Sequence, residues 1–397
     1  MHIRYRLALV ATPLIALVGA FAAPVSPSGA ATTAVPAGPT SDVAYQISIA
    51  HAGYSADPSI TAPLSRKWSV SFSGGVSYPL IVGSRVYVTV AIGDGSGTEL
   101  YALNKNTGKT VWSQQITSTY PWSNAAYDAG QVFVVNSDGG LTAFNATTGA
   151  LNWSEQLPGQ YFFTSPPTAS NGVVYVGGAG SAGTLYAVSE TSGAVLWTQS
   201  VANGDDSSPA LNASSVFVSY ACGLTYSFNR TSGAEQWFSN SSCEGGGGKT
   251  AVVSGGKVYA RDPDLGNKLL NARTGALLGT FQAGPAPAFD GSTGLFLYNG
   301  TLTASSGSAT LWSFTGDGGL DTAPIAVGDT VYVGSSSGEL YGLNVTSGSV
   351  VWSTNVGAAI SAPDEQNVAQ PLTGLGAGRG LLVVPAGDTL VAESSGG

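Results

Sequence analysis

The sequence predicts an all-β fold, a β-propeller of eight four-stranded antiparallel blades. Two observations carry this prediction: a phrase that returns roughly every 40 residues, and short alternating strands within each return. The clearest copies of the phrase read Ala-x-Asn-x-x-Thr-Gly-x-x-x-Trp and cover residues 102–112 and 143–153. A degraded copy has Gly279 in the tryptophan position, and a copy with an extra residue ends at Trp312. Looser copies end at Trp197, Trp237 and Trp352.

Each repeat opens with a strand of alternating apolar residues, and a Gly-rich hairpin leads to a second strand such as Leu100–Leu103. A tight turn of the Asn-x-x-Thr-Gly type follows, where Gly supplies the positive φ that the turn needs, and the tryptophan strand comes last. Eight opening strands are expected at Arg85–Val90, Gln131–Val135, Val173–Val176, Ser215–Val218, Lys257–Ala260, Leu295–Tyr298, Val331–Val333 and Leu381–Val384.

The number of strands predicts how the ring closes. Eight opening strands and eight second strands, the last at Thr389–Glu393, are followed by only seven strands of the tryptophan type. The missing strand is Lys67–Val70, which precedes every other repeat. If it pairs with the C-terminal hairpin, two exposed sheet edges disappear. Seven blades are the alternative, because the unit around 295–312 is short.

The chain divides into three expected parts. Residues 1–30 predict an export signal, because Arg4 and Arg6 precede the apolar run Leu7–Ala23 and small residues follow it. A retained N-terminal anchor is the alternative. Residues 31–62 are expected to form a spacer and an N-terminal arm, and residues 63–397 the propeller. The mature protein is then secreted, cell-surface bound or periplasmic, with no membrane span.

Charge and cysteine content narrow the possible partners. The formal charge is −9, and loss of Arg4 and Arg6 with the signal brings it to −11 (−9 − 2), so the surface repels nucleic acid and anionic lipid.

Two cysteines in an exported chain predict the disulfide Cys222–Cys243. It would close a loop of about 21 residues and stabilise the fold by about 3 kcal/mol.

The repeated phrase resembles the tryptophan docking motif of the pyrroloquinoline-quinone-like (PQQ-like) propeller repeats. That superfamily includes the quinoprotein alcohol dehydrogenases and an eight-bladed outer-membrane assembly lipoprotein, and the resemblance covers roughly residues 65–395. It implies that each tryptophan packs against the neighbouring blade. The residues given this docking role are Trp68, Trp112, Trp153, Trp197, Trp237, Trp312 and Trp352.

The resemblance implies less about function, because some members bind the quinone and others do not. Quinone-binding members have adjacent cysteines and calcium held by Glu, Asn and Asp; this chain has no adjacent cysteines, and no calcium ligands can be assigned. We therefore expect no cofactor, metal or catalytic residue. The leading interpretation is an exported, monomeric, non-catalytic module that binds an extracellular protein or a polysaccharide. The alternatives are a PQQ- and calcium-dependent dehydrogenase and a carbohydrate-active propeller enzyme.

Motifs typical of other enzymes fall in the wrong context. The dinucleotide-like pattern at 178–183 and the hydrolase-like pattern at 334–338 both lie inside hairpins with no helix. A Ser-His-Asp triad would have to use His51, the one histidine left after export, which belongs to the N-terminal arm.

A ligand is expected on one face of the ring. The face with the Asn-x-x-Thr-Gly turns is uniform, whereas the hairpin loops and the links between blades vary and lie on the other face. Exposed aromatics beside carboxylates suit sugar stacking or a protein interface, although the same aromatics could plug the blade ends. The candidates are Tyr120, Trp122, Tyr161, Phe162, Phe163, Asp205, Asp206, Glu244 and Lys249, with Asp317 and Asp321 on the same rim.

Overall fold

The computed structural model describes residues 40–180, 182–202, 207–220, 222–240, 248–262 and 265–396. The chain divides into two units, Met1–Pro36 and Ala37–Gly397, and the first lies outside these ranges together with the expected export signal. Every regular element in the described ranges is a β-strand, and none of their segments is a helix able to cross a membrane.

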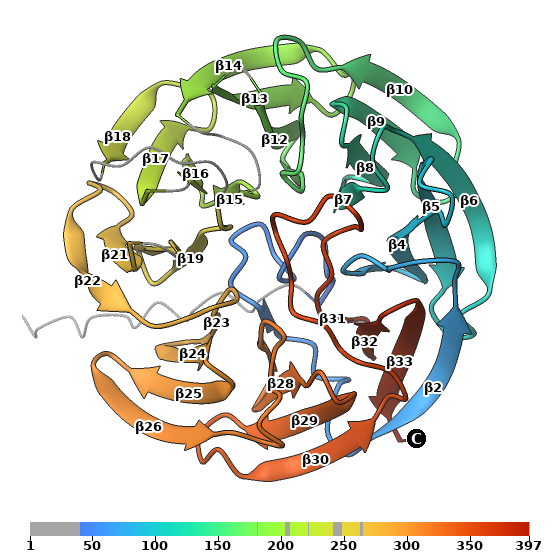
Figure 1. Cartoon of the computed structure of the whole chain (residues 1–397), viewed down its shortest axis with the longest axis vertical. Helices are drawn as coiled ribbons and strands as arrows, with labels where there is room; N and C mark the ends of the chain where they lie inside the picture. The colour runs from blue at the N-terminus through green and yellow to red at the C-terminus, as the bar shows by residue number, and fades with distance from the viewer. Residues whose placement is uncertain are drawn as a thin grey trace, which may run out of the picture. The chain divides into compact units, whose positions relative to one another are not determined.

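The described strands form eight blades arranged in a ring (Figure 1). Each blade has four antiparallel strands. Blades 1 to 7 each use four consecutive strands of the chain, and blade 8 combines strands from both of its ends. Blade 1 contains β3 (Leu80–Val82), β4 (Arg85–Ala91), β5 (Gly97–Asn104) and β6 (Thr110–Thr117). Blade 2 contains β7 (Ser123–Asp128), β8 (Gln131–Asn136), β9 (Gly140–Asn145) and β10 (Leu151–Gln156). Blade 3 contains β11 (Thr168–Ser170), β12 (Val173–Ala179), β13 (Gly183–Ser189) and β14 (Val195–Val201). Blade 4 contains β15 (Ala210–Leu211), β16 (Ser215–Tyr220), β17 (Leu224–Asn229) and β18 (Glu235–Ser239).

The other four blades complete the ring. Blade 5 contains β19 (Val252–Ser254), β20 (Lys257–Ala260), β21 (Asn267–Asn271) and β22 (Leu277–Phe281). Blade 6 contains β23 (Ala288–Asp290), β24 (Thr293–Tyr298), β25 (Thr301–Ser306) and β26 (Ala309–Phe314). Blade 7 contains β27 (Ile325–Val327), β28 (Thr330–Gly334), β29 (Glu339–Asn344) and β30 (Val350–Asn355). Blade 8 contains β31 (Gly376–Gly378), β32 (Leu381–Ala386), β33 (Thr389–Ser395) and β2 (Leu64–Ser71).

The predicted fold class and the predicted closure are confirmed. All eight predicted opening strands lie within the second strands of the blades, and the short unit around Leu295 is the complete blade 6. Strand β2 pairs antiparallel with β33, from Leu64 opposite Ser395 to Ser71 opposite Thr389. The alternative of seven blades is therefore wrong.

The sequence analysis did not predict the innermost strand of each blade. Most of these strands are two or three residues long, such as β15 (Ala210–Leu211) and β27 (Ile325–Val327). So few residues cannot show a period of two. Their inner edges also face the channel of the ring, where N–H and C=O groups need partners.

The N-terminal arm supplies those partners. Residues 40–57, which we call the belt, follow the inside of the ring (blue in Figure 1) and hydrogen-bond to the inner region of one blade after another. Backbone hydrogen bonds of 2.7 to 3.0 Å join Thr40 to Arg379, Asp42 to Ile81, Val43 to Tyr127, Ile49 to Leu211, Ala50 to Val253, Ala52 to Phe289 and Gly53 to Ala326.

The belt makes a full circuit and fills the channel. It reaches blade 3 through the His51 ring, whose Nε2 lies 3.4 Å from the Thr168 hydroxyl. It returns to blade 8 at Asp57, whose carboxylate accepts from the Gly380 amide at 2.8 Å. Tyr45 and Ile47 are completely buried. Strand β1 (Tyr54–Ser55) even adds to blade 7 by pairing in parallel with β27.

Six tryptophans join their blade to the next through one repeated contact. Each indole Nε1 donates to a backbone carbonyl of the next blade at 2.7 to 3.3 Å, and the acceptor lies three residues before the turn glycine. The donors are Trp68, Trp112, Trp153, Trp197, Trp237 and Trp312. Trp352 faces blade 8, whose strands β33 and β2 come from opposite ends of the chain and share no turn.

The Asn-x-x-Thr-Gly turn is shaped to receive the indole. The Asn145 side-chain oxygen accepts from the Thr147 amide and from both the amide and the hydroxyl of Thr148, which fixes the turn. Gly149 has a φ of 74°, and a Cβ atom there would lie 2.6 Å from the Trp112 ring. Glycine is thus required both by the backbone conformation and by the close approach of the ring.

Removing a docked indole should destabilise the ring. Trp68 is 7% exposed, so we expect Trp68→Ala to lower the free energy of unfolding by about 3–5 kcal/mol, through lost packing and a cavity. Trp352→Ala is the matched control, because that indole has no turn carbonyl to bind, and its loss should be smaller. Urea unfolding followed by circular dichroism measures both. Equal losses would contradict a special contribution of the indole hydrogen bond.

The belt should make stability depend on pH through Asp42. Burial raises the pKa of Asp42 well above its usual value, although its Oδ2 accepts from the Ala377 amide at 3.2 Å. The folded state then holds a neutral carboxyl that the unfolded state ionises, so stability is lost as pH rises above the ordinary carboxyl range. Asp42→Asn should therefore raise the melting temperature at pH 7 and have little effect near pH 3.

Asp57→Asn is the matched control on the same belt, with the opposite expectation. Burial alone would raise the pKa of Asp57, but hydrogen bonds from Ser59 and from the Gly380 amide lower it below its usual value. That carboxylate contributes stability above the ordinary carboxyl range, and the contribution is lost as pH falls through its lowered pKa. Asp57→Asn should thus lower the melting temperature at pH 7. If both variants shift it in the same direction, the assignment of Asp42 as a neutral group is wrong.

Candidate functional site

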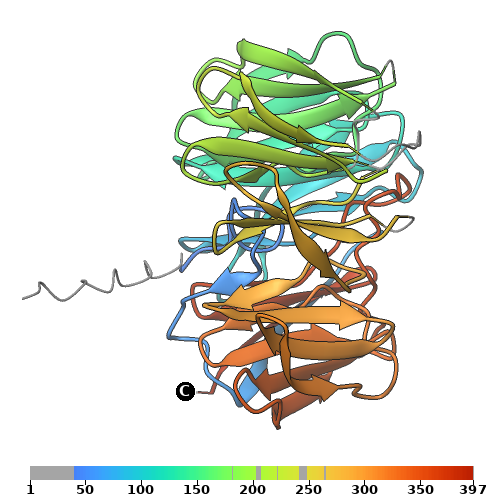
Figure 2. The same ribbon diagram turned by 90° about the vertical axis from the view of Figure 1, so that its left-hand side faces the viewer.

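The two faces of the ring carry different kinds of loop. The turn face carries the first turn of each blade and the Asn-x-x-Thr-Gly turns, together with the belt contacts. The link face carries the middle hairpins and the links between blades, including residues 118–122, 157–167, 315–324 and 356–375. Figure 2 shows the ring from the side, with its strands running between the two faces.

Three of the predicted aromatics lie on the surface of the link face. The exposed fractions are 41% for Tyr120 and 71% for Tyr161, and Phe162 is half-buried. The rings of Tyr120 and Phe162 meet edge to face with centroids 6.1 Å apart. We call Tyr120, Tyr161 and Phe162 the aromatic patch; it belongs to the links before and after blade 2.

The expectation that Trp122 and Phe163 are exposed is wrong. Trp122 is 1% exposed and Phe163 is completely buried, and both belong to the hydrophobic core between blades 2 and 3. A Cβ atom at Gly139 or Gly178 would clash with the Phe163 ring, so the glycines around it make room for this side chain. These two aromatics plug the blade ends, which was the alternative interpretation, because the apolar end of a blade must be covered where a link crosses it.

The predicted charged residues do not form one group. Asp205, Asp206 and Glu244 lie outside the described residues. Lys249 and Asp321 line a pocket of about 390 Å³ on the link face, with Arg261, Asn267 and Gln282 among its other lining residues. Asp317 instead fixes a hairpin, since it accepts from the hydroxyls of Ser335 and Ser337. These hydrogen bonds give Ser335 and Ser337, two serines of the hydrolase-like pattern, a structural role.

A buried ion pair lies at this pocket. The link at 356–375 carries Glu365 to the inner end of blade 5, where its carboxylate pairs with the Arg261 guanidinium and accepts from the Thr250 amide. The side chains are 2% and 0% exposed for Arg261 and Glu365. Arg261 also donates to the carbonyls of Gly284 at 2.8 Å and Thr250 at 3.2 Å.

This pair was missed by the sequence interpretation. The available signal was an arginine directly after the opening strand of blade 5, a position where the other repeats carry small, polar or apolar residues. Burial alone would raise the pKa of Glu365, but the charges of Arg261 and then Lys249, with the hydrogen bond from Thr250, hold it below its usual value. The carboxylate is therefore ionised and already satisfied by the protein.

His51 is positioned as a structural residue. Its Nδ1 lies 2.7 Å from the Tyr45 carbonyl and its Nε2 lies 3.1 Å from the Pro209 carbonyl. Burial lowers its pKa, which favours the neutral ring. A neutral ring with Nδ1 protonated donates to Tyr45 and can accept from the Thr168 hydroxyl. In this tautomer Nδ1 fixes the fold of the belt itself, and Nε2 joins the belt to blade 3.

The described residues identify no site for the calcium and quinone that some members of the superfamily bind. Within those ranges no three His, Cys, Asp or Glu side chains lie close enough to share a metal ion. The belt fills the channel, and Glu365 is paired with Arg261. We therefore derive no chemical step through the quinone.

Comparison with known proteins agrees with this architecture. Residues 61–182 and 181–374 match a family model of PQQ-like repeats described as outer membrane protein assembly factor BamB. No curated protein matches the sequence significantly. The structure is similar to that of BamB from Moraxella catarrhalis, with a TM-score of 0.64 and 18% sequence identity over 83% of this chain and 99% of that chain.

Two enzymes share the fold at lower sequence identity. Quinohemoprotein alcohol dehydrogenase from Comamonas testosteroni has a TM-score of 0.73 at 13% identity, over 90% of this chain and 81% of that chain. A europium-containing methanol dehydrogenase has a TM-score of 0.67 at 14% identity, over 89% of this chain and 98% of that chain. At these identities the likeness concerns the fold alone.

Breaking the buried ion pair from one side should be costly. Glu365→Gln leaves the Arg261 charge buried without a counterion, and we expect it to lower the free energy of unfolding at pH 7 by about 3–5 kcal/mol. The control replaces both residues by methionine, which should recover much of the loss. Because the pKa of Glu365 is lowered, the deficit of Glu365→Gln should shrink as pH falls through that pKa. Equal stability of Glu365→Gln and the parent would contradict this account.

Proposed function

Because this chain belongs to the family of PQQ-like repeat propellers described as outer membrane protein assembly factor BamB, we propose that it is an exported, non-catalytic binding module. Its partner is a protein or a polysaccharide outside the cytoplasm. The family description, an assembly factor, favours a protein. The binding surface is the link face, where the loops of this chain vary from blade to blade.

The aromatic patch is the observation that carries this proposal. Exposed Tyr and Phe side chains supply large contact areas with few rotatable bonds, so little side-chain entropy is lost on binding. The backbone beneath Tyr120 is also fixed. The Ser118 hydroxyl donates to the Tyr120 carbonyl at 2.7 Å, and the Thr119 amide donates to Asp138 at 2.8 Å. Such preorganisation lowers the cost of binding.

Phe162 is held with equal firmness on the neighbouring link. Its amide and carbonyl both pair with Ala179, at 3.1 and 2.8 Å. The Tyr161 hydroxyl donates to the Gly180 carbonyl, so this ring is fixed against the hairpin of blade 3 although most of its surface is exposed. A rigid aromatic surface of this kind is typical of an interface hot spot.

Export and the disulfide belong to the same proposal. Residues 1–30 direct export, and the mature chain is secreted, bound to the cell surface or periplasmic. Cys222 is buried at the hairpin after β16, while Cys243 lies outside the described residues. We propose that the two form a disulfide in the oxidising compartment that the chain reaches.

The aromatic patch should bind without stabilising the ring. A photocrosslinking phenylalanine analogue at position 120 should capture a defined partner in the producing cells, and the same analogue at the exposed position 111 of blade 1 should not capture it. The double change Tyr120→Ala with Tyr161→Ala should weaken binding of that partner by about 2 kcal/mol or more, with little change in melting temperature.

Two controls make this test decisive. Trp122→Ala removes a buried ring from the same link, so it should lower stability by about 3–5 kcal/mol and act on binding only through unfolding. Leu151→Ala, at a residue 61% exposed on the outer strand of blade 2, should change neither property. Equal capture at positions 120 and 111, or unchanged binding by the double variant, would count against the aromatic patch.

A further inference from the structure

One interface between blades lacks the indole that the others use. Blade 5 has Gly279 in the tryptophan position, opposite Leu269 in the strand register. A Cβ atom at Gly279 would meet nothing within 4 Å. Blade 6 has also lost its part of the dock, because a short hairpin at Gly307 and Ser308 replaces the Asn-x-x-Thr-Gly turn that offers the carbonyl. Both halves of the repeated contact are missing at this one interface.

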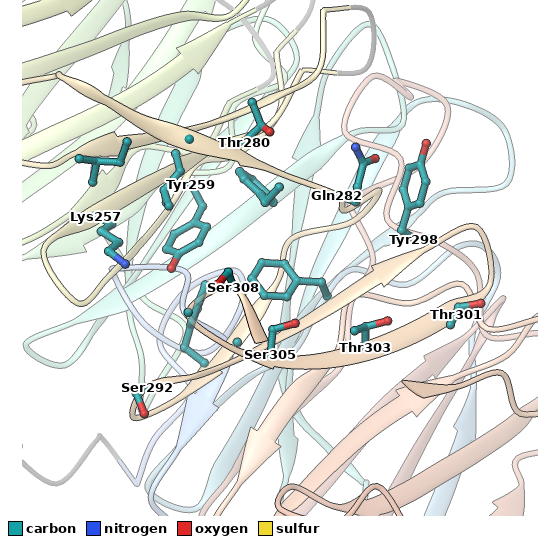
Figure 3. A pocket seen from close by; sticks show the side chains of 18 of the residues that line it. Lys257, Tyr259, Thr280, Gln282, Ser292, Tyr298, Thr301, Thr303, Ser305 and Ser308 are labelled. Carbon is teal, nitrogen blue, oxygen red and sulfur yellow. The ribbon is translucent and has the colours of Figure 1, made fainter. Parts of the chain in front are cut away.

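A cavity of about 770 Å³ occupies the position of the missing contact (Figure 3). This volume lies in the range of ligand sites and is far larger than an indole needs. Tyr259 and Phe281 line it from blade 5, and Phe296 and Tyr298 line it from blade 6. Tyr259 occupies the position whose counterpart Tyr87 packs on Trp112; here its ring packs on Phe289 at 4.5 Å instead.

A row of hydroxyl groups lies beside Phe296 and Tyr298 on blade 6 and faces the rings of blade 5. Thr301, Thr303 and Ser305 alternate along β25, so all three point into the groove, while the residues between them are buried in the blade. Figure 3 shows the row along one strand, with Lys257 at one end of the groove and Gln282 at the other. Lys257 is the single charged residue among those that line it.

The groove continues onto the link face. Gln282 and Tyr298 line both the groove and the pocket of about 390 Å³ that holds Lys249 and Asp321. A ligand that enters between blades 5 and 6 can therefore extend over the rim. This continuity suits a linear chain better than a single compact molecule.

We propose that the groove between blades 5 and 6 binds a neutral, linear glycan. Sugar rings present apolar C–H faces that stack on aromatic side chains and hydroxyl rims that exchange hydrogen bonds with Thr, Ser and Gln. The groove offers both kinds of surface, with aromatic rings from both blades and the hydroxyl row beside Phe296 and Tyr298 on blade 6. An aromatic side chain from a partner protein fits less well, because the turn carbonyl that accepts from an indole at the other interfaces is missing here.

This site is separate from the aromatic patch, which lies on the links beside blade 2. Calorimetric titration of the exported protein with cellohexaose, maltohexaose, mannohexaose, xylohexaose and chitohexaose tests the proposal directly. At least one of these neutral oligosaccharides should bind. Thr303→Phe, which fills the groove, and Tyr298→Ala, which removes an aromatic that is 45% exposed, should each weaken that binding at least about tenfold.

Thr142→Phe is the matched control. Thr142 holds the equivalent position in blade 2 and pairs with the Ser154 hydroxyl at 3.0 Å, as Thr303 pairs with Ser313 at 3.2 Å, but Trp112 fills its interface. That variant, and Tyr120→Ala in the aromatic patch, should bind the oligosaccharide like the parent. Melting temperatures show whether Thr303→Phe and Tyr298→Ala are folded.

Three results would overturn the proposal. The first is that none of the five oligosaccharides binds at millimolar concentration. The second is that binding survives in both folded groove variants or is lost equally in Thr142→Phe. The third is that only an acidic oligosaccharide, or the indole compound N-acetyltryptophanamide, occupies the groove. Loss of partner binding by the aromatic patch variants would affect the proposed function alone, so failures of the two proposals are distinguishable.

Discussion

The indole hydrogen bond from one blade to the turn of the next is the contact on which this structure depends. A four-stranded blade cannot bury its faces alone, so each needs a neighbour at a fixed distance. Six indoles set that distance by the same geometry, with the ring over a turn glycine and Nε1 bound to a carbonyl. The repeat of the sequence is thus the repeat of one contact, which explains why Trp, Gly and Asn recur together.

Closing the ring pairs the strand edges at the two ends of the chain, but it leaves the inner edges of the blades unpaired in the channel. Pairing β2 with β33 removes the two free edges at the ends of the chain. The innermost strands, however, leave polar backbone groups facing the channel. The belt binds these groups blade by blade, and it brings Asp42 and His51 into a buried environment where their pKa values shift. Both the ring and its filling therefore arise from the need to satisfy backbone hydrogen bonds.

Sequence patterns predicted what is periodic and missed what is not. The opening strands and closure could be found because Val86, Trp68 and their equivalents recur at positions that pack. The belt could not, because its partners are backbone groups that leave no side-chain pattern. Trp122 and Phe163 were misplaced for a related reason: a link of few residues does not reveal which aromatic turns inward. Arg261 and Glu365 lie 104 residues apart, and only the fold brings them together.

The most informative position is where the repeat fails. In the sequence, Gly279 reads as a degraded copy, and the short hairpin of the following repeat reads as a separate irregularity. The structure shows that they are the two halves of one missing dock. The ring keeps its closure at this interface because seven other interfaces and the belt hold blades 5 and 6 in place, so the space of the lost indole stays open as a cavity. Because the other interfaces hold the ring together, one interface can lose its indole contact. A repeat protein can acquire a binding site at such an interface without changing its fold.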